Sequence, residues 1–235
     1  MNLILLTPKD CPQTNTAILT SRRLQHVLAV HQAQVGQTLR VGMVNGLMGE
    51  AEIIRLDEQE LHLQFNLTQA PPPKLPLTLI LALPRPKMLK RILQTIATMG
   101  VERLVLMNSY RVEKSFWHSP FLQPDAIQHE LILGLEQARD TVLPEVILEK
   151  RFKPFVEDRL ASLSADTLCL VAHPMAEQSC PRAVNQPVTL AIGCEGGFIP
   201  YEVDLLAQQG FISVELGGRI LRVETAVTAL IARLF

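Results

Sequence analysis

Two glycine turns that carry charged residues lie close together near the end of the sequence. The first, GCEGG at 193–197, follows the apolar run VTLAI, and the second opens the segment LGGRILRVETA at 216–226. Glycine lets the backbone approach a ligand closely and adopt conformations closed to other residues. The N–H and C=O groups of such turns could bind the edge of an adenine or a carboxylate. Each turn taken alone could equally be an ordinary tight loop.

A phosphate-binding loop is not indicated. The sequence contains neither GxxxxGKS nor GxxxxGKT, and no GxGxxG follows a strand-like run. Glu195 also stands where a nucleotide phosphate would lie, and its negative carboxylate would repel the negative phosphate. The first turn is therefore better suited to a cationic ligand.

From residue 77 onward, strand-like and helical patterns alternate. The run LTLILAL is continuously apolar, as is typical of a strand buried on both faces. Further strands are predicted at LVLM, EVILE, TLCLVA, VTLAI and FISVEL. Helical patterns cover 87–99, 124–138, 200–209 and 223–234. Such alternation predicts a mainly parallel α/β sheet. Ligands bind such sheets outside the carboxyl ends of the strands, where the two glycine turns and the loop 172–174 are expected.

Residues 1–70 follow a different pattern. A helix is predicted at 21–30, and the short alternating runs that predict strands are QTLRVGM, GEAEIIRL and ELHLQFNL. A small β-barrel fits these elements. The proline-rich stretch 71–76 stops both helices and strand ladders. We therefore predict a linker there, between an N-terminal domain at 1–70 and a C-terminal domain at 77–235.

Composition limits the classes of function. The net charge is −1 and 48% of the residues are apolar, so the chain can build a core and is not a polycation. Residues 71–115 nevertheless hold eight Lys or Arg against two Glu, which could attract an anionic polymer or form a solvated helix face. The four cysteines form no CxxC pair, so no metal site is expected. We find no signal peptide and no apolar run of membrane-spanning length, which favours a cytoplasmic protein.

The chain from GCEGG to its end closely resembles the C-terminal signature of the RsmE family, 16S ribosomal RNA uridine-N3 methyltransferases of the SPOUT superfamily. The family's first turn usually reads GPEGGF, and LGxRILRxETA follows it. The stretch beginning PRPKMLKRIL is similar to the family's first α/β unit, and VGQTLRVG is similar to part of its N-terminal half. The resemblance implies an α/β fold with an N-terminal PUA-like β-barrel that helps to hold RNA. It also implies a C-terminal SPOUT domain whose end is threaded into a trefoil knot.

The resemblance further implies a cofactor and partners. S-adenosylmethionine is expected in the knot, against backbone groups of three loops, with no metal. The expected substrate is 16S ribosomal RNA or the assembled small ribosomal subunit, and the protein is expected to be a homodimer without membrane contact. The implied cofactor-binding residues are Ala172, His173, Ile192, Gly193, Cys194, Glu195, Gly196, Leu216, Gly217, Gly218, Arg219, Ile220 and Leu221.

Three charged residues are candidates for catalysis. Methylation of uridine N3 requires a group that removes the N3 proton or stabilises the resulting anion. Arg222 could stabilise the anion, and Glu224 could orient Arg222 or act as the base. Glu195 could face the sulfonium or cap nearby backbone. The alternative for Arg219, Arg222 and Glu224 is a salt bridge at the start of a helix.

Six basic residues are candidates for contacts with RNA phosphates, although each alone could be an ordinary surface charge. They are Arg22, Arg23, Arg40, Lys87, Lys90 and Arg91. Two departures from the family pattern matter here. Cys194 stands where proline is usual, and EQARD at 136–140 replaces the more frequent EQSGR. The second departure puts the exact RNA target in question.

Other functions stay open at this point. The chain could be an RNA-binding module that keeps the pocket without turnover, although intact Arg219, Arg222 and Glu224 oppose this. It could be a methyltransferase of the same fold with another RNA target. A general nucleotide-binding enzyme is disfavoured because a phosphate loop is missing.

Overall fold

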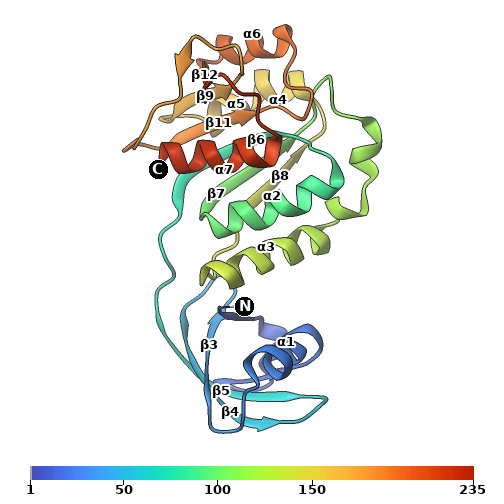
Figure 1. The fold of residues 1–235 in the computed structure, drawn as a ribbon, viewed down its shortest axis with the longest axis vertical. Coiled ribbons are helices and arrows are strands. Elements are labelled where there is room, and N and C mark those ends of the chain that lie inside the picture. The colour runs from blue at the N-terminus through green and yellow to red at the C-terminus, as the bar shows by residue number, and fades with distance from the viewer. Residues whose placement is uncertain (1) are drawn as a thin grey trace. The chain divides into compact units, whose positions relative to one another are not determined.

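The computed structural model describes residues 2–235, apart from the side chain of His31 (Figure 1). The chain divides into two compact units. The first comprises the residues up to Pro73 together with Ile132–Leu143, and the second comprises Lys74–Leu131 and Pro144–Phe235. Helix α3 (Pro124–Ala138) therefore contributes residues to both units.

The first unit is built on a curled five-stranded sheet. Its strands lie in the order β1-β3-β4-β5-β2, and every neighbouring pair is antiparallel except β1 and β3. The bounds are β1 (Ile4–Leu6), β2 (Thr16–Leu19), β3 (Thr38–Met43), β4 (Met48–Leu56) and β5 (Leu61–Gln69). The three strands predicted in this region are confirmed as β3, β4 and β5, while β1 and β2 lie outside the predicted strands.

Residues 21–31 are helical, in two geometries. Helix α1 (Ser21–His26) is followed by a π-helical turn, Val27–His31, and a 3-10 turn at Pro8–Asp10 lies earlier in the chain. Leu24 and Val27 are buried in the hydrophobic core of this unit. The predicted helix at 21–30 is therefore confirmed, although its second half is wound as a π-helix.

Residues 132–143 complete the first unit by binding the turn between β3 and β4. The Thr141 carbonyl accepts a hydrogen bond from the Asn45 N–H (2.8 Å), and the Thr141 hydroxyl donates one to the Gly46 carbonyl (2.5 Å). A Cβ at Gly42 would lie 2.4 Å from Thr141 Cγ2, so glycine is needed there for this approach.

The EQARD segment, 136–140, ends helix α3. Arg139 has a φ of 58°, the left-handed conformation in which helices often end and which favours glycine. Asp140 is buried, and its carboxylate accepts hydrogen bonds from the N–H groups of Thr141 (2.6 Å) and Val142 (3.0 Å). Asp140 therefore stabilises the chain just beyond the helix.

The second unit is built on a seven-stranded sheet in which every neighbouring pair is parallel. The strand order is β10-β12-β9-β11-β6-β7-β8. All five residues of β11 are buried. The bounds are β6 (Leu75–Ala82), β7 (Val101–Met107), β8 (Glu145–Glu149), β9 (Leu168–Ala172), β10 (Gln178–Ser179), β11 (Val188–Ile192) and β12 (Ile212–Glu215). The predicted parallel α/β sheet is confirmed.

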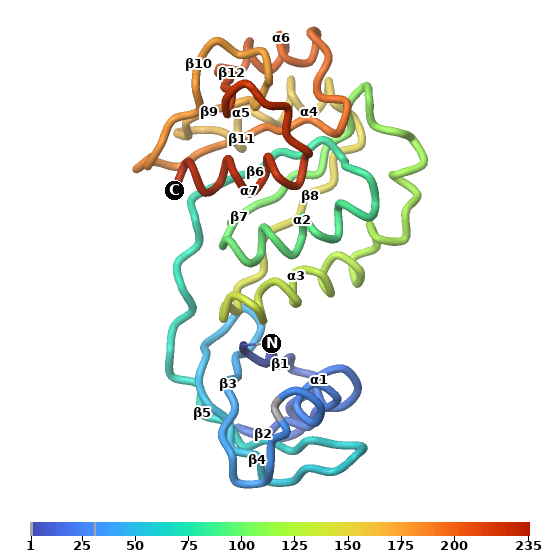
Figure 2. Tube along the Cα trace, in the orientation of Figure 1, coloured from blue at the N-terminus to red at the C-terminus, as the bar shows by residue number. Residues whose placement is uncertain are grey.

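Helices cover this sheet. Helices α2 and α7 lie side by side on one face (Figure 1), and Figure 2 follows the chain from β12 into α7, which contacts β11. No helix within residues 2–235 is long and apolar enough to cross a membrane. The remaining bounds are α2 (Pro86–Thr98), α4 (Phe152–Asp158), α5 (Leu160–Leu163), α6 (Pro200–Gln208), α7 (Val223–Leu234) and the 3-10 turns Lys114–His118 and Pro120–Leu122.

Candidate functional site

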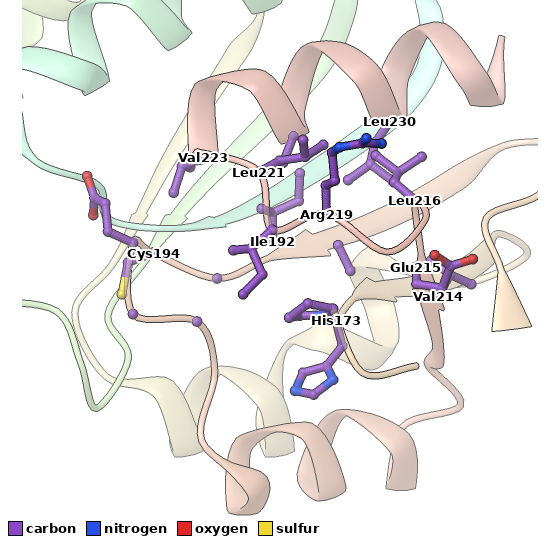
Figure 3. Close-up of a pocket in the computed structure, with 18 of the residues that line it drawn as sticks. His173, Ile192, Cys194, Val214, Glu215, Leu216, Arg219, Leu221, Val223 and Leu230 are labelled. Atoms are coloured by element: carbon purple, nitrogen blue, oxygen red, sulfur yellow. The ribbon is translucent and has the colours of Figure 1, made fainter. Parts of the chain in front are cut away.

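A cavity lies where β9, β11 and β12 end. The three strands end within one residue of the same level, because Ile192, the last residue of β11, pairs with Ala172, the last residue of β9, and Ala172 pairs with Val214, the residue before the end of β12. The loops that follow these strands therefore leave the sheet at nearly the same level. Together with the start of α7 they enclose a cavity of about 300 Å³ (Figure 3). The two glycine turns and the loop 172–174 thus meet at one cavity.

The first glycine turn folds tightly on itself. The Gly197 N–H donates a hydrogen bond to the Cys194 carbonyl (2.8 Å), and Gly197 has a φ of 71°. A Cβ on Gly193 would lie 2.8 Å from Gly197 Cα. Both glycines are therefore required by the path of the backbone. Cys194 is buried within this turn and lines the cavity.

The second turn is fixed by Glu215, the last residue of β12. Its carboxylate accepts hydrogen bonds from the Ser179 hydroxyl (2.6 Å) and from the Gly217 N–H. These hydrogen bonds hold the pKa of the Glu215 carboxyl below its usual range. Gly217 has a φ of 105°, which favours glycine. The cavity is therefore bordered by a carboxylate that is ionised and tied to the turn.

The remaining walls of the cavity are largely apolar. They include the side chains of Ile192, Val214, Leu216, Ile220, Leu221 and Leu230. Cys194 and Glu215 lie at opposite ends of the cavity, and His173 lies across from Leu221 (Figure 3). A cavity of about 300 Å³ is at the lower end of the range for small-molecule sites. The combination suits a ligand with an apolar ring and a positive charge.

Every residue expected at the cofactor site lines this cavity except Gly218. That these residues bind a cofactor stays a prediction. Pro174 and Gly197, which belong to the predicted loop and turn, also line the cavity. Sequence reasoning missed further lining residues, which are Val214, Glu215, Val223, Ala226 and Leu230. Val223, Ala226 and Leu230 recur at helical spacing, a signal that identifies the inward face of α7 but not that it borders a cavity.

The three residues predicted to act in catalysis occupy different environments. Glu195 lines the cavity, and its carboxylate accepts a hydrogen bond from the Arg85 N–H (3.1 Å). Arg222 is the exposed N-cap residue of α7 and Glu224 is half-buried in its first turn, and neither lines the cavity. Within residues 2–235 no ion pair joins Arg219 or Arg222 to Glu224, so the alternative of a helix-start salt bridge is not seen there.

Three of the six residues predicted to contact RNA take part in ion pairs. These pairs are Arg22 with Glu136 (2.8 Å), Arg23 with Asp10 (2.5 Å) and Lys90 with Glu130 (3.1 Å). Burial acts to raise the pKa of Asp10, but hydrogen bonds from Arg23 and Thr7 outweigh it and lower that pKa below its usual value. Each of these three basic side chains therefore has an acidic partner within its own unit.

The other three predicted RNA contacts, Arg40, Lys87 and Arg91, are exposed. Arg40 belongs to β3 in the first unit, and Lys87 and Arg91 belong to α2 in the second. Long basic side chains in solvent are able to reach a phosphate without first breaking an ion pair. These three residues are therefore the better candidates for phosphate contacts.

The chain is similar to known RNA methyltransferases. The family described as RNA methyltransferase domain matches residues 71–235. The chain is 28% identical over 236 aligned residues to the ribosomal RNA small subunit methyltransferase E of Treponema pallidum, covering 97% of this chain and 88% of that protein. The match therefore extends over nearly the whole of both proteins.

Two solved structures share the fold. A methyltransferase from Legionella pneumophila in complex with S-adenosylmethionine has a TM-score of 0.76 at 22% identity, covering 98% of this chain and 95% of that one. A ribosomal RNA small subunit methyltransferase E from Neisseria gonorrhoeae bound to S-adenosylmethionine has a TM-score of 0.75 at 20% identity, covering 99% and 95%. With the matching signature and the matching domain, the chain belongs to the RsmE family of RNA methyltransferases.

Proposed function

We propose that the protein transfers a methyl group from S-adenosylmethionine to N3 of a specific uridine in 16S ribosomal RNA. The observation that carries this proposal is the cavity in which the two glycine turns of the RsmE signature meet the loop 172–174. Membership of the family supports methyl transfer to RNA. The names of full-length relatives, which specify the small ribosomal subunit, support the substrate.

The residues around the cavity fit S-adenosylmethionine. The apolar side chains of Leu216, Leu221 and Leu230 suit the faces of an adenine ring, and the backbone of the glycine turns suits its polar edge. The carboxylates of Glu195 and Glu215 suit a ligand that carries positive charge. When bound, the cofactor supplies an electrophilic methyl carbon attached to a sulfonium.

The protein must then align uridine N3 with that methyl carbon, and it must remove the N3 proton or stabilise the anion that forms when this proton is lost. Arg222 is our candidate for stabilising the uracil anion, because it is an exposed cation directly after the cavity-lining segment. Glu224 is proposed to orient Arg222 or to act as the base. The hydrogen bond from the Arg85 N–H supports a holding role for Glu195 at the start of α2, where a negative charge is favourable.

RNA binding is proposed for both units. We assign the first unit as a PUA-like domain that contributes phosphate contacts through Arg40, and the second as the SPOUT methyltransferase domain, with contacts through Lys87 and Arg91. The ion pairs of Arg22, Arg23 and Lys90 support structural roles for these three instead. The target uridine lies in folded RNA, so we expect it to be turned out of its stack to reach the cavity.

The trefoil knot, the homodimer and the cytoplasmic location also belong to this proposal. The knot is supported by the order of the strands, since β11 and β12 flank β9 and the loops of all three border one cavity. The homodimer rests on the resemblance to the RsmE family.

A methyltransferase of the same fold with another RNA target is less well supported. That alternative depended on EQARD, at 136–140, being an RNA contact. Asp140 is buried and binds backbone N–H groups, and Arg139 occupies a helix-ending conformation. The departure from EQSGR is therefore explained by local folding and does not require a different substrate.

The direct test is methylation of small ribosomal subunits that lack the modification. The protein is incubated with labelled S-adenosylmethionine and these subunits, the RNA is digested, and the methylated nucleoside is identified. We expect 3-methyluridine at one site near the 3′ end. Binding of the cofactor without any labelled 3-methyluridine would refute the proposed reaction. ATP added as a competitor should not displace the cofactor, and displacement would favour a general nucleotide-binding enzyme.

Arg222→Ala tests the catalytic assignment. Loss of the cation should reduce kcat by about a hundredfold or more, as removal of one charge-stabilising group does in other enzymes. Affinity for S-adenosylmethionine should change little, because Arg222 does not line the cavity. Turnover that persists with intact cofactor affinity would show that Arg222 has no such role.

A further inference from the structure

The loop after β7, residues 108–111, contacts the first glycine turn through Arg111 and has no role in the function described so far. We infer that Tyr110 and Arg111 receive the target nucleotide of the RNA beside the cavity, Arg111 on a phosphate and Tyr110 against a base, and that buried Glu202 positions both. This inference rests on the proposed function and names the substrate side of the same site.

Arg111 is fixed to the wall of the cavity. Its Nη1 donates a hydrogen bond to the carbonyl of Gly196, a cavity-lining residue. A Cβ at Gly196 would lie 2.8 Å from Arg111 Cδ. The Arg111 side chain therefore occupies the space that a side chain at position 196 would need. An arginine has five N–H donors, and the residue is exposed, so donors remain for a phosphate.

A second arginine is held against the same turn. The Arg85 N–H donates to the Glu195 carboxylate (3.1 Å), and the Arg85 residue is exposed. Arg85 follows β6 and Arg111 follows β7. These two strands are neighbours in the sheet, and β11 separates them from β9. The positive charges therefore extend the site along the sheet edge, away from the part of the cavity near Glu215. Glu195 is the acidic group that faces this side.

Tyr110 combines a fixed backbone with an exposed ring. It is 79% exposed, although the residues around it are held in place. Ser109 is 2% exposed, and the Trp117 Nε1 donates a hydrogen bond to the Asn108 side chain (2.8 Å). An exposed aromatic ring on an anchored loop loses little conformational entropy when a base stacks on it. A base that has left its own stack provides such a partner.

Glu202 explains how this loop is held. It is 3% exposed, and its two carboxylate oxygens accept hydrogen bonds from the N–H groups of Tyr110 (2.7 Å) and Ile199 (3.0 Å). A buried carboxylate is unfavourable unless such bonds compensate its lost hydration. Ile199 follows the first glycine turn by two residues. Glu202 therefore joins the loop after β7 to the chain that leaves the cavity wall.

The inference is tested with Arg111→Ala and Tyr110→Ala in the full-length protein. KM for small subunits that lack the modification and Kd for S-adenosylmethionine are measured. We expect Arg111→Ala to raise KM about tenfold or more and Tyr110→Ala about fivefold, with the cofactor Kd within threefold of wild type. Tyr110→Phe keeps the ring and should match wild type. Arg182→Ala removes an exposed arginine outside the cavity and should also match wild type.

Glu202→Gln tests the positioning role, since glutamine keeps the shape but can accept only one of the two N–H bonds well. We expect the KM of this variant for the RNA to rise about fivefold. Its kcat and its Kd for the cofactor should stay within threefold of the wild-type values. The double variant of Glu202→Gln with Arg111→Ala should raise KM by less than the product of the two single effects, because part of the Glu202→Gln effect acts through Arg111. Fully additive effects on KM would refute the positioning role.

The inference is overturned if Arg111→Ala and Tyr110→Ala keep the wild-type KM, or if the cofactor Kd rises as much as KM does. Binding of the same subunits, measured without cofactor, separates this failure from that of the proposed reaction. Wild-type protein that binds the subunits but transfers no methyl group refutes the reaction. In that case weaker binding by Arg111→Ala still supports the inference, and unchanged binding refutes it. Absence of any RNA binding by wild type refutes both.

Discussion

At Gly193 the backbone leaves no room for a side chain. A Cβ there would lie 2.8 Å from Gly197 Cα and 2.9 Å from the Phe198 N, both main-chain atoms that cannot rotate away. The turn would have to open to accept even a methyl group. Because Cys194, Glu195 and Gly196 of this turn line the cavity, its shape depends on the absence of one Cβ.

We therefore expect Gly193→Ala to weaken S-adenosylmethionine binding by at least tenfold, measured by calorimetry. Gly218→Ala is the matched control, since a Cβ at Gly218 meets nothing within 4 Å and Gly218 does not line the cavity. The control should bind the cofactor as wild type does. Equal affinities of the two variants would show that the tight turn is not needed for binding.

Arg139 offers a prediction on stability. It has a φ of 58° at the end of α3, a conformation that is strained for a residue with a Cβ but not for glycine. Arg139→Gly should therefore raise the free energy of unfolding by about 1 kcal/mol, measured by thermal or urea denaturation. Methylation of the RNA should stay unchanged. A clear loss of RNA affinity would instead indicate that the Arg139 side chain contacts the substrate.

At the scale of elements, the first unit depends on a late segment of the chain. The carboxylate of Glu136 on α3 is 2% exposed, and Arg22 of α1 donates two hydrogen bonds to it (2.8 and 3.1 Å). The Glu136 carbonyl also accepts hydrogen bonds from the N–H groups of Asn2 and Leu3. The end of α3 thus ties together α1 and the N-terminal residues of the same unit.

Arg22→Ala should consequently lower the free energy of unfolding by about 2 kcal/mol, because it deprives a buried carboxylate of its charged partner. Arg40→Ala is the control, since Arg40 is exposed on β3 and its loss should change stability by less than about 0.5 kcal/mol. Denaturant unfolding of the full-length variants compares them. An Arg22→Ala protein as stable as wild type, but with weaker RNA binding, would restore Arg22 as a phosphate contact.

The elements were predictable where their patterns were long. Helices α2, α6 and α7 and the buried strands of the second unit follow clear apolar patterns, so their positions were readable from the sequence. Strands β1, β2 and β10 have two to four residues, too few for any periodicity to show. Their pairing depends on partners far away in the sequence.

At the scale of the whole molecule, the near-neutral net charge hides an uneven distribution. The net charge is −1, yet residues 71–115 carry eight Lys or Arg against two Glu. Two of these basic side chains form ion pairs, Lys90 with Glu130 and Arg103 with Glu145. Arg85, Lys87, Arg91 and Arg111 are exposed. The positive charge that remains is therefore concentrated on residues available to a polyanion.

Binding of RNA should in consequence depend on salt, and the triple variant Arg40→Ala, Lys87→Ala, Arg91→Ala should reduce that dependence. The plot of log K against log salt concentration has a negative slope, and loss of three phosphate contacts should reduce the magnitude of this slope by roughly 2 to 3. The control variant combines Lys150→Ala, Arg151→Ala and Arg182→Ala, which removes the same charge from exposed residues elsewhere. Equal slopes for the two variants would argue for a general charge effect and against specific contacts.

The class of the protein can be read from its sequence. Local patterns and the glycine-rich signature are properties of neighbouring residues, and they sufficed for a parallel α/β sheet, three candidate loops and the RsmE family. Which side chains are in contact is known only from the folded chain. The pairing of Arg22 with Glu136 spans 114 residues, and the contact of Arg111 with Gly196 spans 85. Such contacts arise from chain topology, which brings distant residues to one place without leaving a pattern in the sequence near either of them.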